Sequence, residues 1–461
     1  MRVGPYFRAS RVTRRRGIAP QQFVNHPDTA CDASAPRICW LTEEFYPPQI
    51  GGAELMVARL TQGLAHRGFA VNVITRQPER PCAPRERIGR VVVRRIRPAG
   101  QIKGSGWPAL PFVFAYLARL AWLLVREARG YDILIVSGMK VIPLVAVPVS
   151  RLLGKRCVVR LESTSEISEP LTAESVESMA NRLGRLARAF SSRVQWSMLR
   201  RADRAIAPSA ALQAALRTSG FPTAQVSTIP NAVDLAQFHP VTPRERLHLR
   251  GELGLPRDAT LLIFIARLSR AKGIDLLVDA WPRIAARHPE LCLVIVGAGA
   301  GSYDDCERDI AESIRRAALG PDRVRMTGVT DRVADYLQAA DLYILPSDYE
   351  GFGVGIIEAL ATGLPTLLTP VGVAPQLVRD GENGFLFPVR DREAMIRAID
   401  TAMTVRARWP EIGARARAAV EGMGLETVVQ EYVQLCADLV GGRSNSTGRP
   451  SGQEVGSRAN A

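Results

Sequence analysis

The sequence predicts an α/β protein with two parallel β-sheets, and three observations support this prediction. Short apolar runs alternate with stretches of helical periodicity along most of the 461 residues. The runs are uniformly apolar, as strands buried on both faces of a sheet should be. The first two strands of each half are separated by similar lengths, 33 residues in one half (38 to 71) and 30 in the other (261 to 291). Both lengths match a βαβ unit.

The first sheet is expected to begin with a strand at 38–41. A loop with Gly51 and Gly52 follows, and apolar residues at helical spacing then lead to a second strand at 71–74. Further strands are expected at 133–136 and 157–159. The apolar stretch 107–125 contains Arg119, so we expect a buried helix there rather than a membrane span.

The second sheet is expected to begin at 261–265, followed by a loop that holds Arg267, Lys272 and Gly273. Apolar spacing predicts a helix after this loop. Pro282 is expected to break that helix, because an interior proline removes a helix hydrogen bond. The remaining apolar runs predict strands at 291–296, 342–345 and 366–369.

The two ends of the chain are expected to be disordered tails. Residues 1–36 are rich in arginine without a steady apolar period, and residues 441–461 are rich in Gly, Ser, Asn and Arg. The early arginines are not followed by an apolar run, so no signal peptide is expected.

Two domains are expected between the tails, a first at 37–235 and a second at 240–424, with a final helix at 425–440. Phe238, Pro240 and Pro243 interrupt the pattern between them. Ligands of parallel sheets bind beyond the carboxyl ends of the strands. Two facing domains would therefore enclose a cleft, where we expect the functional site.

Composition narrows the function classes. Hydrophobic residues make up 47% of the chain, which excludes global disorder. Lysine and arginine number 60 against 45 acidic residues, giving a net charge of +15 that favours anionic partners such as nucleotides, phosphorylated substrates or acidic lipids. Nucleic acid is not expected as a partner, because no aromatic-basic platform accompanies the charge. The seven cysteines show no C-x-x-C pair, so neither a disulfide framework nor a zinc cluster is expected, and a reducing cytoplasm is the expected compartment.

The most informative stretch is S-D-Y-E-G-F-G-V-G-I-I-E-A-L at 347–360, where a strand ends and a helix begins near Val354. Its alternating glycines permit close backbone approach, and the helix start presents free N–H groups to an anion or to sugar hydroxyls. Glu350 lies on the loop and Glu358 one turn inside the helix. Carboxylates accept two hydrogen bonds each, so the pair can bind a sugar. A structural alternative is an ordinary turn whose glutamate complements the helix dipole.

Two further loops are expected at the cleft. Arg267 and Lys272 follow a strand of the same sheet, where they could neutralise a diphosphate and stabilise it as a leaving group; otherwise they are solvated surface cations. Gly51 and Gly52, followed by Glu54, could approach a ligand from the first domain. The run V-G-A-G-A-G at 296–301 lacks the spacing of a dinucleotide-binding fingerprint.

The run E-G-F-G-V-G-I-I-E at 350–358 resembles the E-x7-E motif of the family 4 retaining glycosyltransferases, the "glycosyl transferases group 1". Other stretches are similar to motifs of that family in order and spacing: G-G-A-E at 51–54, I-P-N-A-V-D at 229–234, A-R-L-S-R-A-K-G at 266–273, D-L-Y-I-L-P-S at 341–347 and G-L-P-T at 363–366. The resemblance covers about residues 37–440.

The resemblance implies a GT-B fold, in which two Rossmann-like domains face each other across a cleft. The first domain would bind the acceptor, the second would bind a nucleotide-diphosphate sugar as donor, and the final helix would pack back on the first. Glu358 would hold the donor ribose, Arg267 and Lys272 the diphosphate, and Glu350 the donor sugar. The other expected donor-site residues are Gly351, Phe352, Gly353, Val354, Gly51 and Gly52. The family needs no bound metal, and the resemblance implies no cofactor.

One position departs from the family. Many members have a histidine after a strand of the first domain, facing the reacting sugar, and Glu162 stands at that place in V-V-R-L-E-S-T-S-E, 158–166. Glu162 is therefore a second candidate catalytic residue beside Glu350. It could instead be a surface carboxylate paired with Arg160, with the departing phosphate taking the acceptor proton.

The expected function is retaining transfer of a sugar to a hydroxyl of a saccharide or lipid-linked saccharide, in polysaccharide or glycolipid synthesis. Residues 178–202 carry six arginines and no acid, so this segment could dock on anionic lipid at the inner face of the membrane, or cover the core with an arginine face outward. The alternative to an enzyme is a non-catalytic GT-B module that binds a nucleotide or a partner protein.

Overall fold

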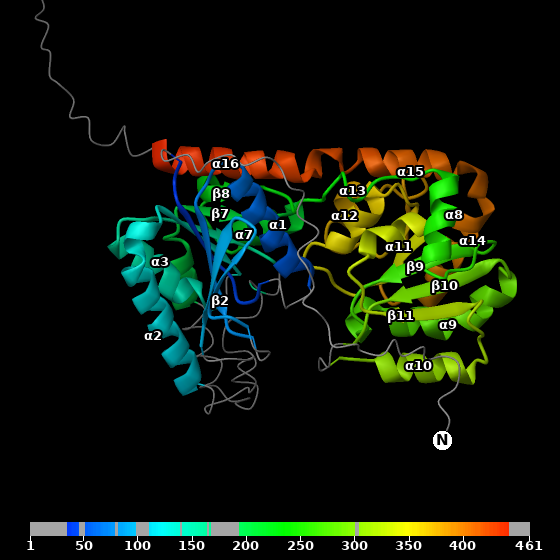
Figure 1. Ribbon diagram of the computed structural model, residues 1–461. Helices are drawn as coiled ribbons and strands as arrows, with labels where there is room; N and C mark the ends of the chain where they lie inside the picture. The colour runs from blue at the N-terminus through cyan, green and yellow to red at the C-terminus, as the bar shows by residue number, and fades with distance from the viewer. Residues whose placement is uncertain are drawn as a thin grey trace, which may run out of the picture.

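The computed structural model describes residues 35–45, 51–78, 82–97, 110–138, 141–163, 166, 193–299 and 304–441. Within them, two separate sheets lie side by side, each flanked by helices (Figure 1). The predicted α/β fold with two parallel-sheet domains is confirmed.

The first sheet has the strand order β3-β4-β2-β1-β5-β6-β7-β8 and is parallel except at the β3–β4 hairpin. Strand β1 lies in its centre, where Ile38 pairs with Val71 on one side and with Ile133 on the other. The strands are β1 (Ile38–Leu41), β2 (Val71–Arg76), β3 (Arg85–Ile88), β4 (Val91–Ile96), β5 (Ile133–Ser137), β6 (Arg156–Arg160), β7 (Arg204–Ile206) and β8 (Val226–Ser227).

Both faces of this sheet are buried, because alternate residues of β1 enter two different cores. Ile38 and Trp40 pack with α1 (Gly52–His66) and α16 (Leu425–Gly441). Cys39 and Leu41 pack with α2 (Leu110–Arg126), α3 (Pro143–Leu152) and α7 (Ala210–Thr218) on the other face. Uniform burial of this kind is what makes the strand a continuous apolar run in the sequence.

The second sheet is parallel with the strand order β11-β10-β9-β12-β13-β14. Its strands are β9 (Thr260–Ile265), β10 (Leu291–Val296), β11 (Val324–Gly328), β12 (Leu342–Leu345), β13 (Thr366–Leu368) and β14 (Phe385–Leu386). Its helices are α8 (Pro243–Glu252), α9 (Ile274–Arg287), α10 (Glu307–Arg316), α11 (Val333–Ala339), α12 (Val354–Ala361), α13 (Ala374–Leu377), α14 (Arg392–Thr404) and α15 (Trp409–Ala418). One core cluster joins sheet and helices.

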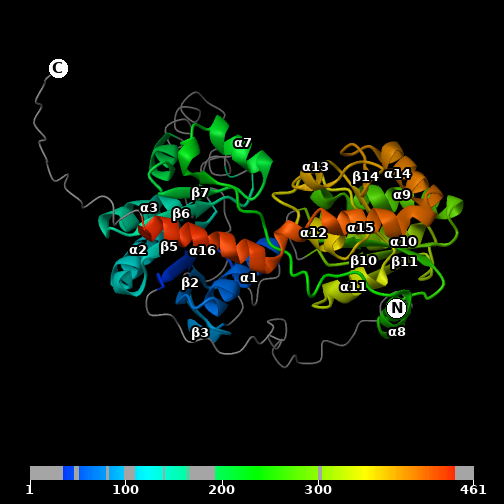
Figure 2. The same cartoon turned by 90° about the horizontal axis from the view of Figure 1, so that it is seen from above.

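The chain crosses between the domains twice, and the two crossings touch. Val233 donates its N–H to Met423 O and accepts from Leu425 N, so the outgoing linker pairs with the start of α16. Helix α16 then runs from the second domain across the first (Figure 2). There Tyr432 stacks on Trp40 of β1 with ring centroids 5.7 Å apart. The final helix thus ties both domains together.

Two local expectations are wrong. Helix α9 continues through Pro282, because its apolar face, including Leu277, Trp281 and Ile284, is buried and holds the helix together on both sides of the proline. The helix within 107–125 is buried on only one face, since Phe114 and Trp122 of α2 are largely exposed.

Candidate active site

The carboxyl ends of strands from both sheets meet between the domains. In the second domain the loop after β12 leads into α12, and the loop after β9 leads through a short 3-10 turn, Arg270–Lys272, into α9. In the first domain the loops after β1, β5 and β6 surround one cavity. This is the edge at which ligands of parallel sheets bind.

The glycine loop of the second domain touches the first domain directly. A Cβ atom at Gly351 would overlap the carbonyl oxygen of Glu162 and lie 3.2 Å from Ser163 Cβ. Gly353 precedes α12 with φ +93°, a conformation that favours glycine. On the first-domain side, a Cβ at Gly52 would lie 3.4 Å from Val354 Cβ. The two glycine loops predicted from sequence therefore face one another.

Lys272 and Glu350 form an ion pair, with Lys272 Nζ 2.7 Å from Glu350 Oε1. The Ser347 hydroxyl donates to the same oxygen at 2.8 Å. Gly273 follows the lysine with φ +69°, and a Cβ there would overlap the Pro346 carbonyl, so the cation loop is pressed against the glycine loop. These contacts place the predicted diphosphate cation beside the predicted sugar-binding carboxylate.

Arg267 is exposed at the mouth of the cleft. Burial raises the pKa of Glu54 on the opposite wall, and the positive charge of Arg267 is among the influences that oppose this rise. The two predicted cations therefore differ in their surroundings: Lys272 is paired with Glu350, whereas Arg267 is exposed to solvent.

Glu358 lies below this surface, in an ion pair that the sequence did not predict. Arg59 of α1 donates from Nη1 to Glu358 Oε1 at 3.0 Å, and both side chains are under one-tenth exposed. The Arg59 guanidinium also lies over the ring of Phe238 in the linker, 5.5 Å from its centroid. Burial raises the pKa of Glu358, and Arg59 opposes the rise. The carboxylate predicted to hold a ribose is thus bound to the first domain in this structure.

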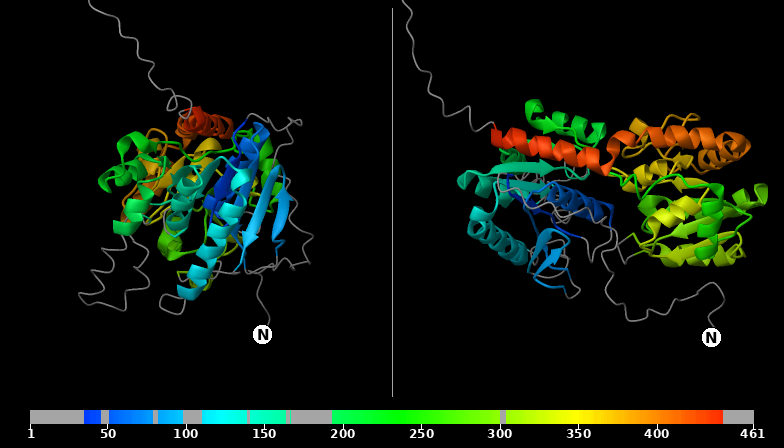
Figure 3. Two further views of the ribbon diagram at one scale, coloured as in Figure 1. Left: turned by 90° about the vertical axis from the view of Figure 1, so that its left-hand side faces the viewer. Right: turned by 45° about the horizontal axis from the view of Figure 1, so that its top comes forward.

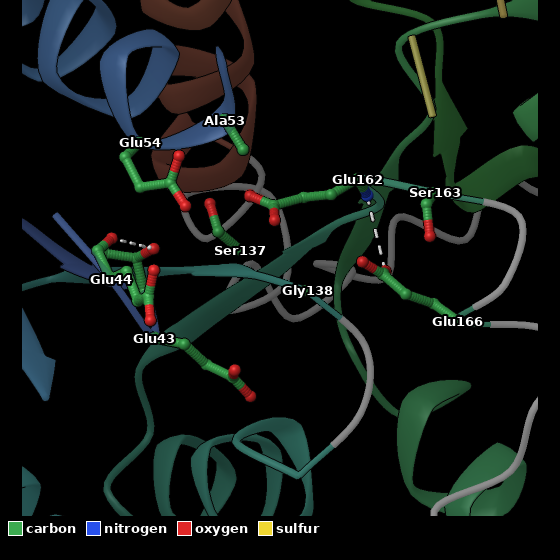
Figure 4. A pocket seen from close by; sticks show the side chains of 10 residues that line it. Glu43, Glu44, Ala53, Glu54, Ser137, Gly138, Glu162, Ser163 and Glu166 are labelled. Atoms are coloured by element: carbon green, nitrogen blue, oxygen red, sulfur yellow. Dashed lines mark hydrogen bonds between the residues drawn. The ribbon is translucent and has the colours of Figure 1, made fainter. Parts of the chain in front are cut away.

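The first domain contributes a cavity of about 300 Å³ at the ends of β1, β5 and β6 (Figure 4). Five of its lining side chains are carboxylates, and the carboxylates of Glu54 and Glu162 point into the same space near Ser137. The lining residues are Thr42, Glu43, Glu44, Ala53, Glu54, Ser137, Gly138, Glu162, Ser163 and Glu166.

Glu162 is paired with Arg160, as the structural alternative expected, and it also lines the cavity. Its Oε1 lies 3.5 Å from Arg160 Nη1, and its carboxylate lines the cavity. Burial raises the pKa of Glu162, and Arg160 is the largest influence that lowers it. Arg160 is itself 2% exposed and donates to Asn231 Oδ1, in the I-P-N-A-V-D stretch. This buried arginine fixes the position of the carboxylate.

The predicted site residues converge with two exceptions. Glu350, Gly351, Glu162, Gly51 and Gly52 lie together at the cleft, as described above. Glu358 lies deeper, under α1. The side chain of Phe352 is 4% exposed and packs in the second-domain core, so it does not line the cleft.

Sequence reasoning missed Arg59 and gave Arg160 only a surface role. The signal for Arg59 was a charged residue beside Met56, Val57 and Leu60 on the apolar face of a helix. A buried arginine of this kind requires a partner, but nothing in the sequence identifies a glutamate 299 residues away.

Two family models of glycosyltransferases match most of this chain. Residues 50–237 match the family model described as "Glycosyltransferase Family 4", and residues 245–418 match "Glycosyl transferases group 1". A D-inositol 3-phosphate glycosyltransferase of Nocardiopsis dassonvillei is 30% identical over 353 residues, 73% of this chain and 77% of that protein. The lipopolysaccharide core biosynthesis mannosyltransferase LpsB of Rhizobium meliloti is 30% identical over 217 residues, which span 46% of this chain and 59% of that protein.

Two solved structures share the fold. Sucrose-phosphate synthase from Thermosynechococcus elongatus aligns with a TM-score of 0.72 at 24% identity, over 88% of this chain and all of that one. HepE of Anabaena, solved in complex with UDP-glucose, aligns with a TM-score of 0.66 at 21% identity, over 87% of this chain and all of that one. Both similarities are similarities of fold, that is, of the arrangement of the two domains.

Proposed function

This chain belongs to the group 1 glycosyltransferases, and on that premise we propose that it moves a sugar from a nucleotide-diphosphate sugar to a hydroxyl of a saccharide or lipid-linked saccharide, with retention of anomeric configuration. The observation that carries the proposal is the approach of Gly351 to the Glu162 carbonyl. It brings the anion-binding loop of one domain against the acidic cavity of the other, so that two substrates can meet there.

The second domain supplies the donor site in this proposal. Arg267 and Lys272 neutralise the diphosphate, and the start of α12 adds free N–H groups at the same place. Glu350, freed from Lys272 as the lysine turns to the phosphate, accepts hydrogen bonds from the donor sugar. Arg59 binds Oε1 of Glu358, and the other carboxylate oxygen, Oε2, accepts hydrogen bonds from the ribose hydroxyls. No cofactor is assigned, because these cations can neutralise the leaving group.

The first domain supplies the acceptor site. Ionised carboxylates accept hydrogen bonds and donate none, so a cavity with five of them is suited to a polyhydroxylated acceptor. Glu162 is the candidate proton acceptor, since burial raises its pKa toward the range in which a carboxylate can take a proton. The acceptor oxygen gives its proton to Glu162 and bonds to the anomeric carbon on the face from which the diphosphate departs, so that the configuration is retained. The bond from that carbon to the phosphate oxygen breaks, and the diphosphate leaves with its electrons.

The name of one relative supports a saccharide acceptor, because that protein is a mannosyltransferase of lipopolysaccharide core biosynthesis. We place the protein in the cytoplasm, in peripheral contact with the membrane, where lipid-linked saccharides are available. Within the described residues, none of the helices is long and apolar enough to cross a bilayer.

A non-catalytic nucleotide-binding module is the second candidate, favoured by Glu162 at the place where the family resemblance implies a histidine. The experiment that separates the two begins with a screen of UDP-glucose, UDP-galactose, GDP-mannose and ADP-glucose for protection against thermal unfolding. Hydrolysis of the protecting donor is then measured. We expect Glu350→Ala to abolish turnover and a matched surface variant, Glu312→Ala on α10, to retain it. Protection without turnover in the parent protein would favour the non-catalytic module.

A further inference from the structure

Helix α2 presents a large apolar surface to solvent on the outer side of the first domain. Among the exposed large apolar side chains of the described residues, three belong to this one helix: Phe114 is 67% exposed, Trp122 59% and Val125 55%. Isolated exposed apolar residues are ordinary, but several on one helix indicate an interaction site.

These side chains share one face. Successive helix residues are about 100° apart, so Phe114, Trp122 and Val125 fall within an arc of about 80°. Tyr116 and Leu120 point the other way and are buried in the domain core. The helix therefore has two apolar faces, one that packs in the domain core and one that is exposed to solvent.

The surroundings of the outer face are basic. Arg119 and Arg126 are exposed beside the arc, and the Arg126 guanidinium lies over the Trp122 ring, 5.0 Å from its centroid. Neither α2 nor the neighbouring α3 contains an aspartate or glutamate. The next acid along the chain, Glu127, is paired with Arg94 at 2.7 Å. No acidic side chain of these two helices offsets the arginines.

The face points away from the second domain. Figure 1 shows α2 at the outer edge of the first domain, and Figure 3 shows the same helix (cyan) at the front when that edge faces the viewer. A flat partner could therefore cover it without blocking movement of the two domains about their linker.

We infer that the outer face of α2, formed by Phe114, Trp122 and Val125 with Arg119 and Arg126, docks on an anionic lipid surface. Apolar side chains would enter the boundary between headgroups and acyl chains, tryptophan would lie at that boundary, and the arginines would bind lipid phosphates. Charge complementarity selects this partner. A second copy of the same face would bring arginines against arginines, and the N-terminal segment 1–36 is also basic.

This inference rests on the proposed function in one respect: docking would hold the acceptor cavity near a lipid-linked saccharide. It differs from the docking segment expected from sequence, 178–202, most of which lies outside the described residues. In the described part, Arg200 donates to Ser219 O at 2.7 Å, so this arginine caps a helix end of the same domain.

The test is flotation of the full chain with vesicles of phosphatidylethanolamine and phosphatidylglycerol, and with vesicles of phosphatidylcholine alone, at physiological salt. We expect binding to the anionic vesicles only. The double variant Phe114→Ser/Trp122→Ser should bind about tenfold more weakly, because two anchors of the apolar face are lost. A matched double variant on α8 of the second domain, Leu247→Ser/Arg244→Gln, should bind like the parent protein.

A second readout reports the site itself. Addition of anionic vesicles should shift the tryptophan fluorescence of the parent protein to the blue, and Trp122→Phe should abolish that shift while retaining binding. Urea midpoints of all variants should match the parent, since the changed side chains are exposed.

The inference is overturned if the parent does not float, floats equally with phosphatidylcholine, or floats equally after the α2 substitutions. A parent dimer in light scattering that dissociates in the Phe114→Ser/Trp122→Ser variant would also overturn it, because a second copy would then cover the face. Nucleotide-sugar protection is measured in the same samples. Loss of vesicle binding with protection and turnover intact would contradict only the docking, whereas vesicle binding without turnover would contradict only the proposed transfer.

Discussion

Removing the Arg59 guanidinium tests how the buried interdomain ion pair contributes to stability. Arg59→Met keeps a similar apolar stem but leaves the Glu358 carboxylate buried without its cation. The pair distance is 3.0 Å and both side chains are under one-tenth exposed, so water cannot replace the lost partner. Breaking a buried pair of this kind costs about 3–5 kcal/mol in the free energy of unfolding. For the exposed pair Arg316–Glu312 on α10, Arg316→Met should leave the urea midpoint nearly unchanged, because solvent screens the two charges.

The stability lost in Arg59→Met should depend on pH in a defined direction. Burial already raises the pKa of Glu358 in the folded protein, and without Arg59 that pKa rises further. A carboxyl group whose pKa is raised in the folded state binds its proton more tightly there than in the unfolded chain. Its ionisation therefore reduces stability as the pH rises from the pKa of the unfolded state toward that of the folded state. The deficit of Arg59→Met should therefore be small near pH 4 and largest at neutral pH and above.

Urea unfolding of Arg59→Met, Glu358→Gln and the double variant measures the coupling. Since Glu358→Gln removes the charge that Arg59 compensates, the double variant should be less destabilised than the sum of the single variants, by about 1–3 kcal/mol. Unfolding is followed with probes in both domains, because the pair joins them. A cost below about 1 kcal/mol, equal at pH 4 and pH 8, with additive single variants, would refute the reasoning.

Three other perturbations address the cleft. Lys272→Met should lower donor turnover by about 100-fold, because one cation at the leaving group is lost, and unchanged kcat would remove the lysine from that role. Glu162→Gln should raise the urea midpoint above that of the parent at pH 8 but not at pH 4, because burial raises the pKa of Glu162 and its ionisation costs stability as the pH rises. The same variant should reduce transfer. A midpoint equal to that of the parent at both pH values would contradict a buried charge at this position. Gly273→Ala should destabilise the protein by about 1–3 kcal/mol, since its φ is +69° and the new Cβ would overlap the Pro346 carbonyl, whereas an unchanged midpoint would mean that the loop relaxes freely.

The framework of both sheets could be predicted because its strands are buried on both faces. Each apolar run at 38–41, 291–296 and 342–345 coincides with an observed strand. The hairpin of β3 and β4 was missed. Strand β3 lies at the edge of the sheet and has exposed Arg85 and Arg87, so its sequence carries no apolar run, whereas the short run of three valines in β4 is followed by two arginines.

Errors in the helices have a different cause, because the periodic pattern does not identify what a face contacts. The sequence predicts a break at Pro282, although the packing of Trp281 and Ile284 outweighs one missing hydrogen bond. The apolar sequence of α2 predicts a buried helix, whereas only the face that carries Tyr116 and Leu120 is buried in the structure.

Candidate site residues could be placed at the cleft but not in their present ionic state. Glu350 and Lys272 were expected to act on different parts of a donor, and they are bound to each other. In the proposed function, a donor would exchange this ion pair for contacts to its own phosphate and sugar. The lysine would keep an anionic partner, and the glutamate would accept hydrogen bonds from sugar hydroxyls in place of its cation.

The two walls of the proposed site carry different sets of charged side chains, and this difference would favour one orientation of a donor. The net charge of +15 describes the whole chain, yet the cavity of the first domain is lined by five carboxylates, while Arg267 and Lys272 lie on the second domain. A diphosphate turned toward the carboxylates would meet like charges, whereas the same group at the two cations is neutralised. The sugar is then directed toward the carboxylates, whose oxygens accept hydrogen bonds from its hydroxyls. In the proposed function, the polarity of the two walls would orient the anomeric carbon toward the cavity of the first domain.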